Sequence, residues 1–418
     1  MKIRSLFTPM AKSLMLLWVG HLFMDFCTGI WPIYKTVAKI DIAQAGLIAG
    51  ISGFSGEILQ IVFGYFCDRG YRKKILILGL ILASSILWIT FVKGIFNSFL
   101  VLLLLMLGSG SFHPAATGIA GSLSQTHKGK IILFFASGGA IGLGISQLVF
   151  TNLMEKFNGH AYILFIPLLL IIFAIVYHQF PDQKFIGPST SIKGFFEPIM
   201  HCRKPLLLLY LSQVSIQGLM LAFMFLLPDL LRDRSCHSWL CMGGGHLCFI
   251  LGSALTMVPA GYLCDKYGQK SVMLVVLCCA TVLLYLFLAN HSLSVGLTIL
   301  LLSTLGAFLG IINPIIVSWG NRLVPQNPST VSAILMGFAW CLSNFGPTSA
   351  GIISGYFNEN AFVNAIAILG LSLVLIFFCT LFMPQLAKEP ATLPTVPEEN
   401  NTTETVKAAD LEIEKIDK

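Results

Sequence analysis

The chain has 418 residues, of which 56% are hydrophobic and only 11% are charged, with a mean hydropathy of +0.83 and a formal net charge of +7. Soluble domains carry roughly 25% charged residues, so this chain lacks the polar surface that a soluble protein needs. The composition therefore excludes a soluble globular protein and indicates an integral membrane protein.

Twelve apolar segments follow one another along the chain, separated by polar breaks. A helix of about 20 apolar residues crosses a bilayer, because lipid offers the backbone no hydrogen-bond partners and a helix satisfies its own. The expected transmembrane helices span residues 11–34, 43–66, 75–93, 98–120, 131–154, 161–179, 205–228, 240–263, 271–290, 295–318, 332–356 and 361–383.

The longest break, residues 181–204, divides these segments into two groups of six. We therefore expect an all-α integral membrane fold of two pseudo-symmetric six-helix bundles, over residues 1–180 and 205–383, joined by a central loop over 181–204. Residues 384–418 are rich in proline and acidic side chains and cannot bury a core, so we expect a disordered acidic tail.

Basic residues indicate the orientation, since Lys and Arg are enriched in cytoplasmic loops. With the N-terminus inside, the inner segments hold sixteen Lys and Arg, the tail holds four, and the outer loops hold six, Lys35 among them. We expect a multi-pass protein of the cytoplasmic (inner) membrane with the central loop, the tail and both termini in the cytoplasm.

An internal repeat relates the two groups of six. GYFCDRGYRKK begins at Gly64 and GYLCDKYGQK begins at Gly261, 197 residues later, each just after the second helix of its group. A second match pairs His113 with Asn313, each followed by proline. Duplication in the same orientation predicts two bundles related by an axis along the membrane normal, with a pathway between them.

The loop after each second helix resembles a motif of the major facilitator superfamily, G-x-x-x-D-R-x-G-[RK]-[RK]. The first copy matches at Gly64, Asp68, Arg69, Arg72 and Lys73, with the inner glycine displaced to Gly70, and the second at Gly261, Asp265, Lys266, Gly268 and Lys270. The resemblance covers residues 10–385 and implies a secondary transporter that works by alternating access.

Three shorter motifs resemble the fosmidomycin-resistance-like branch of this superfamily. They are GHLFMD at 20–25 with Pro32 beyond it, Gln60 ahead of FGY, and FHP at 112–114. This resemblance favours export of a small molecule.

Few ionisable residues lie within the apolar segments, and such residues usually mark function, because a charge at a helix centre costs about 2.5–3.5 kcal/mol on insertion scales. His21 and Asp25 are four residues apart on one helix face, and Glu57 is in the second helix. A carboxylate near mid-bilayer beside an imidazole suits proton coupling, so we expect Asp25 with His21, and Glu57 as a second member, to carry protons. The alternative is a buried acid that only locks helices together.

The substrate pathway is expected to use His113, Gln60, Gln213, Gln217 and Asn313. His113 beside a proline could equally be a satisfied imidazole at a kink. No Lys or Arg lies within the central stretch of any helix, whereas a multiply charged anion usually needs a buried cation. A neutral, amphipathic or cationic solute is therefore favoured.

The paired loops are candidates for gating, because each carries a carboxylate at the same position. The expected gating residues are Gly64, Asp68, Arg69, Arg72, Asp265 and Lys266. A carboxylate there could cap a helix or pair with a cation across the two halves. Plain enrichment of basic residues on the inner side is the alternative.

Nucleotide-binding and hydrolase motifs are absent, and no Asp, His or Cys cluster has metal-ligand spacing within the apolar segments, so we expect no enzyme, cofactor or metal ion. The expected partners are a small-molecule solute, protons and the lipid bilayer, with no nucleic acid, for a monomeric carrier. Proton-coupled efflux is favoured, and the alternatives are proton-coupled uptake of a metabolite and a receptor or channel.

Overall fold

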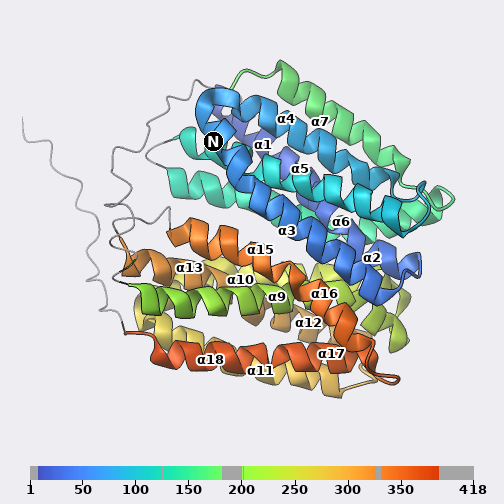
Figure 1. The fold of residues 1–418 in the computed structure, drawn as a ribbon, viewed down its shortest axis with the longest axis vertical. Helices are drawn as coiled ribbons and strands as arrows, with labels where there is room; N and C mark the ends of the chain where they lie inside the picture. Colours follow the sequence, from blue (N-terminus) through green and yellow to red (C-terminus); the bar gives the residue numbers. More distant parts are fainter. Residues whose placement is uncertain (1–7, 125–126, 181–199, 201, 326–330, 386–418) are drawn as a thin grey trace, which may run out of the picture. The chain divides into compact units, whose positions relative to one another are not determined.

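Helices form all the regular secondary structure in the computed structural model, which describes residues 8–124, 127–180, 200, 202–325 and 331–385 (Figure 1). The first half contains α1 Pro9–Thr28, α2 Ile30–Val37, α3 Ile42–Phe66, the π-helical turn η2 Cys67–Tyr71, α4 Arg72–Ala83, η3 Ser84–Trp88, α5 Ile95–Ser122, α6 Lys128–Lys156, η4 Tyr162–Leu164 and α7 Phe165–Tyr177. The second half contains α9 Arg203–Asp233, η5 Leu240–Gly244, α10 Gly245–Tyr267, α11 Gln269–Ala289, α12 Val295–Gly310, α13 Ile312–Leu323, η6 Ala333–Phe338, α15 Ala339–Ser343, α16 Phe345–Ser354, α17 Ala361–Gly370 and α18 Ser372–Phe382.

Each of the twelve expected transmembrane segments overlaps a described helix, and the all-helical membrane fold is confirmed. Within the described residues, nine helical stretches are long and apolar enough to cross a membrane, and one of them, Ile42–Trp88, runs through two of the expected helices. Tyr162–Tyr177 is apolar but shorter, and the helix expected over 332–356 is broken into η6, α15 and α16. The exact count of twelve stays a prediction.

Local sequence sets several helix starts. Pro9 occupies the first turn of α1, where its missing N–H costs nothing, and the Thr8 hydroxyl accepts a hydrogen bond from the Ala11 amide. The Asp41 carboxylate accepts from the Gln44 amide at 2.9 Å and caps α3 in the same way.

Within each half, a pair of glycines brings two helices into backbone contact. In the first half, a Cβ on Gly56 of α3 would collide with the Met106 carbonyl of α5, and a Cβ on Gly110 of α5 with the Gly56 carbonyl. In the second half, Gly252 of α10 and Gly306 of α12 meet carbonyls of each other's helices in the same way. The two pairs are 196 residues apart in the sequence, so the duplication read from the loops extends to helix packing.

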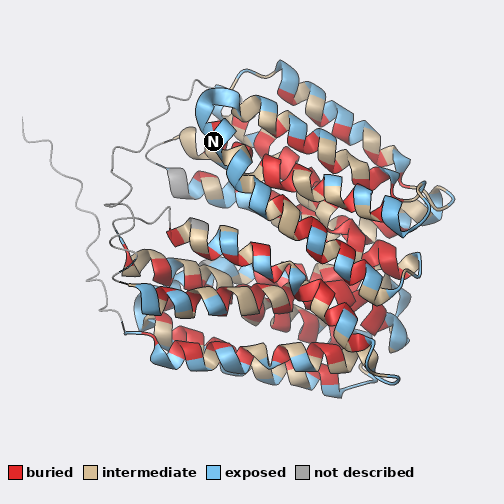
Figure 2. Ribbon diagram, in the orientation of Figure 1, coloured by how far each residue is buried: buried red, intermediate tan, exposed pale blue. Residues whose placement is uncertain are grey.

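Helices α4, α7, α11 and α18 are peripheral. Figure 1 places α4 and α7 at one edge of the view and α11 and α18 at the opposite edge. Leu170, Phe173, Val282 and Phe382 are between 61% and 76% exposed. Figure 2 shows buried residues gathered where helices face one another, with exposed positions on the outside.

Candidate functional site

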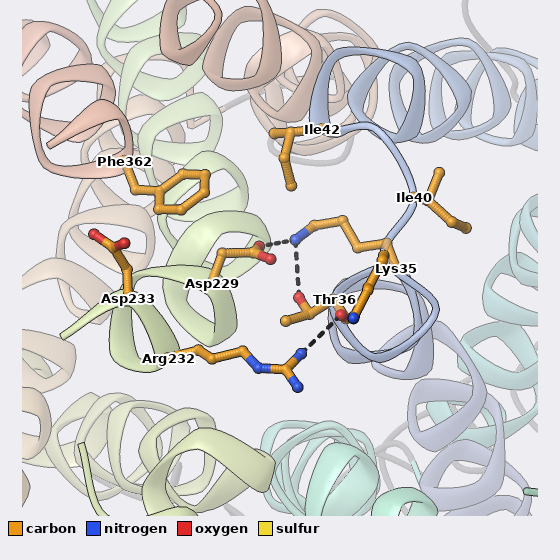
Figure 3. A pocket seen from close by; sticks show the side chains of 9 residues that line it. Lys35, Thr36, Ile40, Ile42, Asp229, Arg232, Asp233 and Phe362 are labelled. Carbon is orange, nitrogen blue, oxygen red and sulfur yellow. Dashed lines mark hydrogen bonds and ion pairs between the residues drawn. The ribbon is translucent and has the colours of Figure 1, made fainter. Parts of the chain in front are cut away.

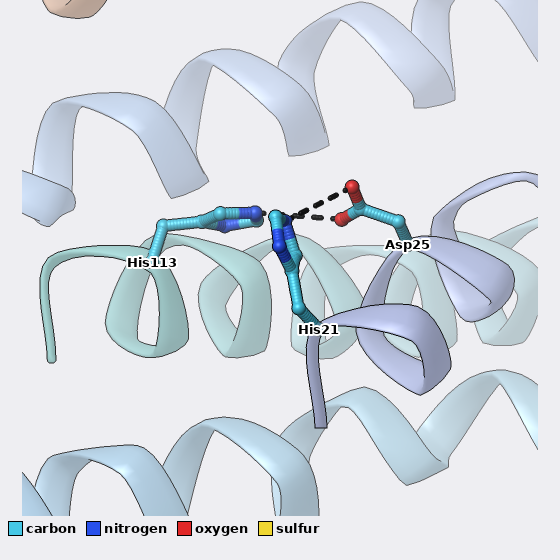
Figure 4. Close-up of side chains that lie close together, drawn as sticks. All are labelled: His21, Asp25 and His113. Atoms are coloured by element: carbon cyan, nitrogen blue, oxygen red, sulfur yellow. Dashed lines mark ion pairs between the residues drawn. The ribbon is translucent and has the colours of Figure 1, made fainter. Parts of the chain in front are cut away.

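The Asp25 carboxylate of α1 faces two imidazoles that come from different helices (Figure 4). Its Oδ2 is 3.3 Å from His21 Nε2 on the same helix, and its Oδ1 is 3.4 Å from His113 Nε2 on α5. The side chains of His21, Asp25 and His113 are 9%, 21% and 30% exposed, so the cluster is largely buried and His113 is its most accessible member. We call these three residues the His–Asp–His cluster.

Backbone carbonyls orient both rings. His21 Nδ1 lies 2.9 Å from the Phe135 carbonyl of α6, and His113 Nδ1 lies 2.9 Å from the Ser109 carbonyl and 3.2 Å from the Ser109 hydroxyl. A carbonyl only accepts, so each Nδ1 carries the proton when it makes this bond. The Nε2 atoms then face the carboxylate, and each contact is strongly attractive only when that Nε2 also holds a proton.

The cluster brings together two residues expected to couple protons and one expected to line the pathway. It also places three potential metal-ligand atoms within 4.8 Å of one another. The expectation of no cluster at metal-ligand spacing is therefore wrong, because His113 is distant in sequence from Asp25 and folding alone brings it there.

Glu57 and Gln60 lie on α3, one helical turn apart and both partly exposed. Glu57 is close enough to His113 for the two charges to interact. The third expected proton carrier thus adjoins the cluster from another helix.

The second-half candidates form a separate polar group. The Gln213 amide of α9 donates to Asn313 Oδ1 of α13 at 2.5 Å, and Gln217 is buried one turn beyond Gln213. These amides suit a neutral or polar solute.

The loop-motif residues contact their own half in this conformation. Asp68 pairs with Arg72 at 3.5 Å, and Arg69 lies over the Tyr65 ring with 3.3 Å to its centroid. Lys266, beside Asp265 at the end of α10, lies 5.0 Å from the Tyr267 ring centroid. A Cβ on Gly64 or Gly261 would meet nothing within 4 Å, so the gating role of these loops stays a prediction.

Two lysines of the same loops have a clear structural role that the sequence reading missed. Lys73 Nζ donates to the carbonyls of Val176 and His178 at 2.7 and 3.0 Å, at the end of α7. Lys270, 197 residues later, donates to the carbonyls of Leu381 and Met383 at 2.8 and 2.9 Å, at the end of α18. Each lysine thus caps the last helix of its own half, where a cation is favoured. The repeat of the loop motif, which places Lys73 and Lys270 at equivalent positions, was the sequence signal for this shared role.

Lys35 joins the two halves, and its expected place in an outer loop is wrong. α2 continues the first span to Val37, and the fully buried Lys35 ammonium forms an ion pair with Asp229 of α9 (Figure 3). Beside it the Arg232 guanidinium donates to the Thr36 carbonyl at 3.1 Å. A pocket of about 330 Å³ adjoins the pair. Lys35 and Asp229 are 194 residues apart, close to the 197-residue spacing of the loop repeat. This spacing was a signal in the sequence that equivalent helix ends of the two halves meet.

Other contacts between the halves lie towards the same end of the helices, hereafter the Lys35 end. Thr348 of α16 donates to the Gly46 carbonyl of α3 at 2.8 Å. Thr151 of α6 donates to the Met242 carbonyl at 2.7 Å, and His246 Nε2 lies 3.0 Å from the Leu143 carbonyl. His246 of α10 is therefore a residue of the interface between the halves.

Sequence comparison agrees with this architecture. The sequence profile of the Major Facilitator Superfamily matches residues 16–342 and, in a second match, 237–411. The chain is 21% identical over 366 residues to the uncharacterized MFS-type transporter YfnC of Bacillus subtilis, covering 83% of this chain and 87% of that protein. It is 21% identical over 357 residues to the fosmidomycin resistance protein of Escherichia coli, covering 81% and 85%.

Solved structures share the fold at low identity. The nucleoside transporter NupG matches with a TM-score of 0.74 and 13% identity over 90% of this chain and all of that one. A bacterial homolog of the human lysosomal transporter Spinster, in an inward-facing and unoccupied conformation, matches with a TM-score of 0.70 and 14% identity over 90% and 97%. With the profile match over most of its length and the duplicated helical halves, this multi-pass membrane chain belongs to the Major Facilitator Superfamily of transporters.

Proposed function

We propose that this chain is a proton-coupled secondary transporter that exports a small neutral, amphipathic or cationic solute by alternating access between its two halves. One observation carries the proposal: the Asp25 carboxylate contacts two imidazoles from different helices. A carrier that couples solute to protons needs a group that is protonated facing one side and deprotonated facing the other.

Asp25 is the coupling acid in this scheme, and the two histidines set when it holds a proton. His113, assigned from the sequence to the substrate pathway, shares the carboxylate with His21 and can transmit its charge state to α5. Glu57 on α3 is the second relay member, since its charge interacts with that of His113. A proton change would then alter contacts among three helices of the first half.

The solute class follows from the charges that remain available. The buried cation Lys35 is already neutralised by Asp229, which leaves the acids of the first half and the amides of the second half to meet a solute. Export agrees with the name of the Escherichia coli fosmidomycin resistance protein, and proton-coupled uptake of a metabolite is the alternative direction. The protein would act in the cytoplasmic membrane, with the Lys35 end outside.

Purified protein in liposomes that contain a pH-sensitive dye tests this function. A panel of neutral, cationic and dianionic solutes is added under an imposed pH gradient, and internal pH and solute content are followed together. We expect saturable solute movement that carries protons in the opposite direction for at least one neutral or cationic solute. Flux that does not saturate would indicate a channel, and saturable flux without proton movement would contradict the coupling.

Native cysteines test the proposed orientation. We expect a membrane-impermeant maleimide to label intact cells that retain only Cys236, which is partly exposed near the Lys35 end. Cells that retain only Cys202, before α9, should label only after they are broken open. Efficient labelling of Cys202 in intact cells would reverse the proposed topology.

The repeated loop carboxylates are expected to matter for turnover rather than insertion. We expect Asp68→Asn and Asp265→Asn together to slow transport about tenfold or more, because each removes a carboxylate that could hold the other end of the pathway shut. Flux in liposomes at matched protein content measures the effect, with exposed Glu155→Gln as the control. Normal turnover in the double variant would remove the gating role.

A further inference from the structure

We propose that the His–Asp–His cluster is also a binding site for a divalent transition metal ion of the Zn²⁺ or Co²⁺ type, which competes with the coupling protons. The site uses the residues of the proposed function, but it rests on geometry and can be tested separately. The metal is a ligand that blocks the carrier, with Asp25, His21 and His113 as its three protein ligands.

The spacing of the ligand atoms fits such an ion. Zn²⁺ binds imidazole nitrogen at about 2.0–2.1 Å and carboxylate oxygen at about 2.0–2.2 Å, usually with tetrahedral geometry, so neighbouring ligand atoms lie roughly 3.3–3.5 Å apart. His21 Nε2 lies 3.3 Å from Asp25 Oδ2 and His113 Nε2 lies 3.4 Å from Asp25 Oδ1, so each imidazole is at this spacing from one carboxylate oxygen. One ligand atom from each of the three residues lies within 4.8 Å of the other two. Little movement is needed to admit an ion between them.

Both imidazoles are already oriented as metal ligands. A metal-bound histidine usually donates its other ring N–H to a carbonyl or carboxylate, which fixes the ring and its tautomer. His21 and His113 make such contacts with the carbonyls of Phe135 and Ser109. Their Nε2 lone pairs then face Asp25, so acceptor atoms converge, and either protons or a metal cation would offset their repulsion.

A neighbouring glycine lets α6 pack directly against the cluster. A Cβ on Gly139 of α6 would overlap the Asp25 carboxylate and the His21 ring, with His21 Cε1 at 2.6 Å. Two further groups lie near the cluster, the Glu57 carboxyl of α3, which interacts with His113, and the buried, neutral Cys27 thiol of α1, which lies near Asp25. The partial exposure of His113 and Asp25 gives an ion a route in. In the described part of the chain, no other three His, Cys, Asp or Glu residues meet at this spacing.

Cobalt binding to the detergent-purified full chain tests the proposal by absorption spectroscopy. We expect one Co²⁺ per chain with visible d–d bands and no sulfur-to-cobalt charge-transfer band. Affinity should fall at least about 100-fold in Asp25→Asn and His113→Gln, since each removes a ligand. His160→Gln, which removes an imidazole distant from the cluster, should bind as the wild type does. Gly139→Ala should weaken binding, whereas Gly144→Ala on the same helix, where a Cβ meets side-chain atoms at 3.4 Å, should not.

His113→Cys separates loss of a ligand from loss of folding. A thiolate is also a good ligand, so this variant should keep the ion and gain the charge-transfer band that the wild type lacks. The proposal is overturned if the wild type binds no Co²⁺, if its bound Co²⁺ already shows a thiolate band, or if His113→Cys binds without one. Proton coupling is measured with a chelator present, so a coupled carrier that binds no Co²⁺ contradicts only this inference. Binding without coupling contradicts only the proposed function.

Discussion

Replacing Asp25 with Asn is expected to abolish transport against a gradient. One charge moved through 100 mV is worth about 2.3 kcal/mol, so one proton could sustain roughly a fifty-fold solute gradient. The variant should sustain no solute gradient. Asparagine keeps the shape of the side chain but cannot take up or release a proton. Exchange of solute across the membrane can persist, because it needs no net proton movement. Steady-state solute ratios in liposomes under a fixed pH gradient measure the effect.

Two comparisons make this result specific. Glu155→Gln removes an exposed carboxylate from α6 and should leave the gradient unchanged. His21→Ala should move the pH optimum rather than remove activity, because His113 still faces the carboxylate. If Asp25→Asn moves solute against a gradient at the wild-type rate, the assignment fails and Glu57 becomes the candidate coupling acid.

Breaking the ion pair between Lys35 and Asp229 is expected to open the Lys35 end. Lys35→Gln leaves the Asp229 carboxylate buried without its cation, which typically costs about 3–5 kcal/mol, and 3 kcal/mol shifts an equilibrium roughly 150-fold. The cost falls on the conformation in which the halves meet here, so the conformation open at this end gains population. The labelling rate of Ile42→Cys, beside the pocket, reports this opening in a cysteine-free chain.

A double-variant cycle distinguishes the ion pair from its separate residues. Asp229→Asn alone should resemble Lys35→Gln, whereas the two substitutions together remove both charges and should restore slow labelling. Lys39→Gln removes an exposed cation from the same pocket and is the matched control. Equal labelling of the double variant and either single variant would show that the pair does not hold this end closed.

The sequence alone determined the membrane class, the duplicated halves and the family. These depend on composition, on apolar segments of bilayer length and on a loop motif repeated after 197 residues. All three can be recognised in the sequence without knowing which helices contact one another. Hydropathy does not define helix ends closely, because it drops at a charged residue even when an ion pair keeps that residue buried. Lys35 was assigned to a loop for that reason.

Only the tertiary structure decided which polar groups share a site. His21 and Asp25 could be paired from the sequence, since residues four apart lie on one helix face. No helical periodicity links them to His113 on α5 or to the Phe135 carbonyl on α6, and no local pattern links Lys35 to Asp229 across the halves. These partners meet because glycine-rich helix faces, such as that of Gly139, pack backbone against backbone. Neighbouring residues determine where a helix forms, but contacts between helices depend on how entire helix faces fit together.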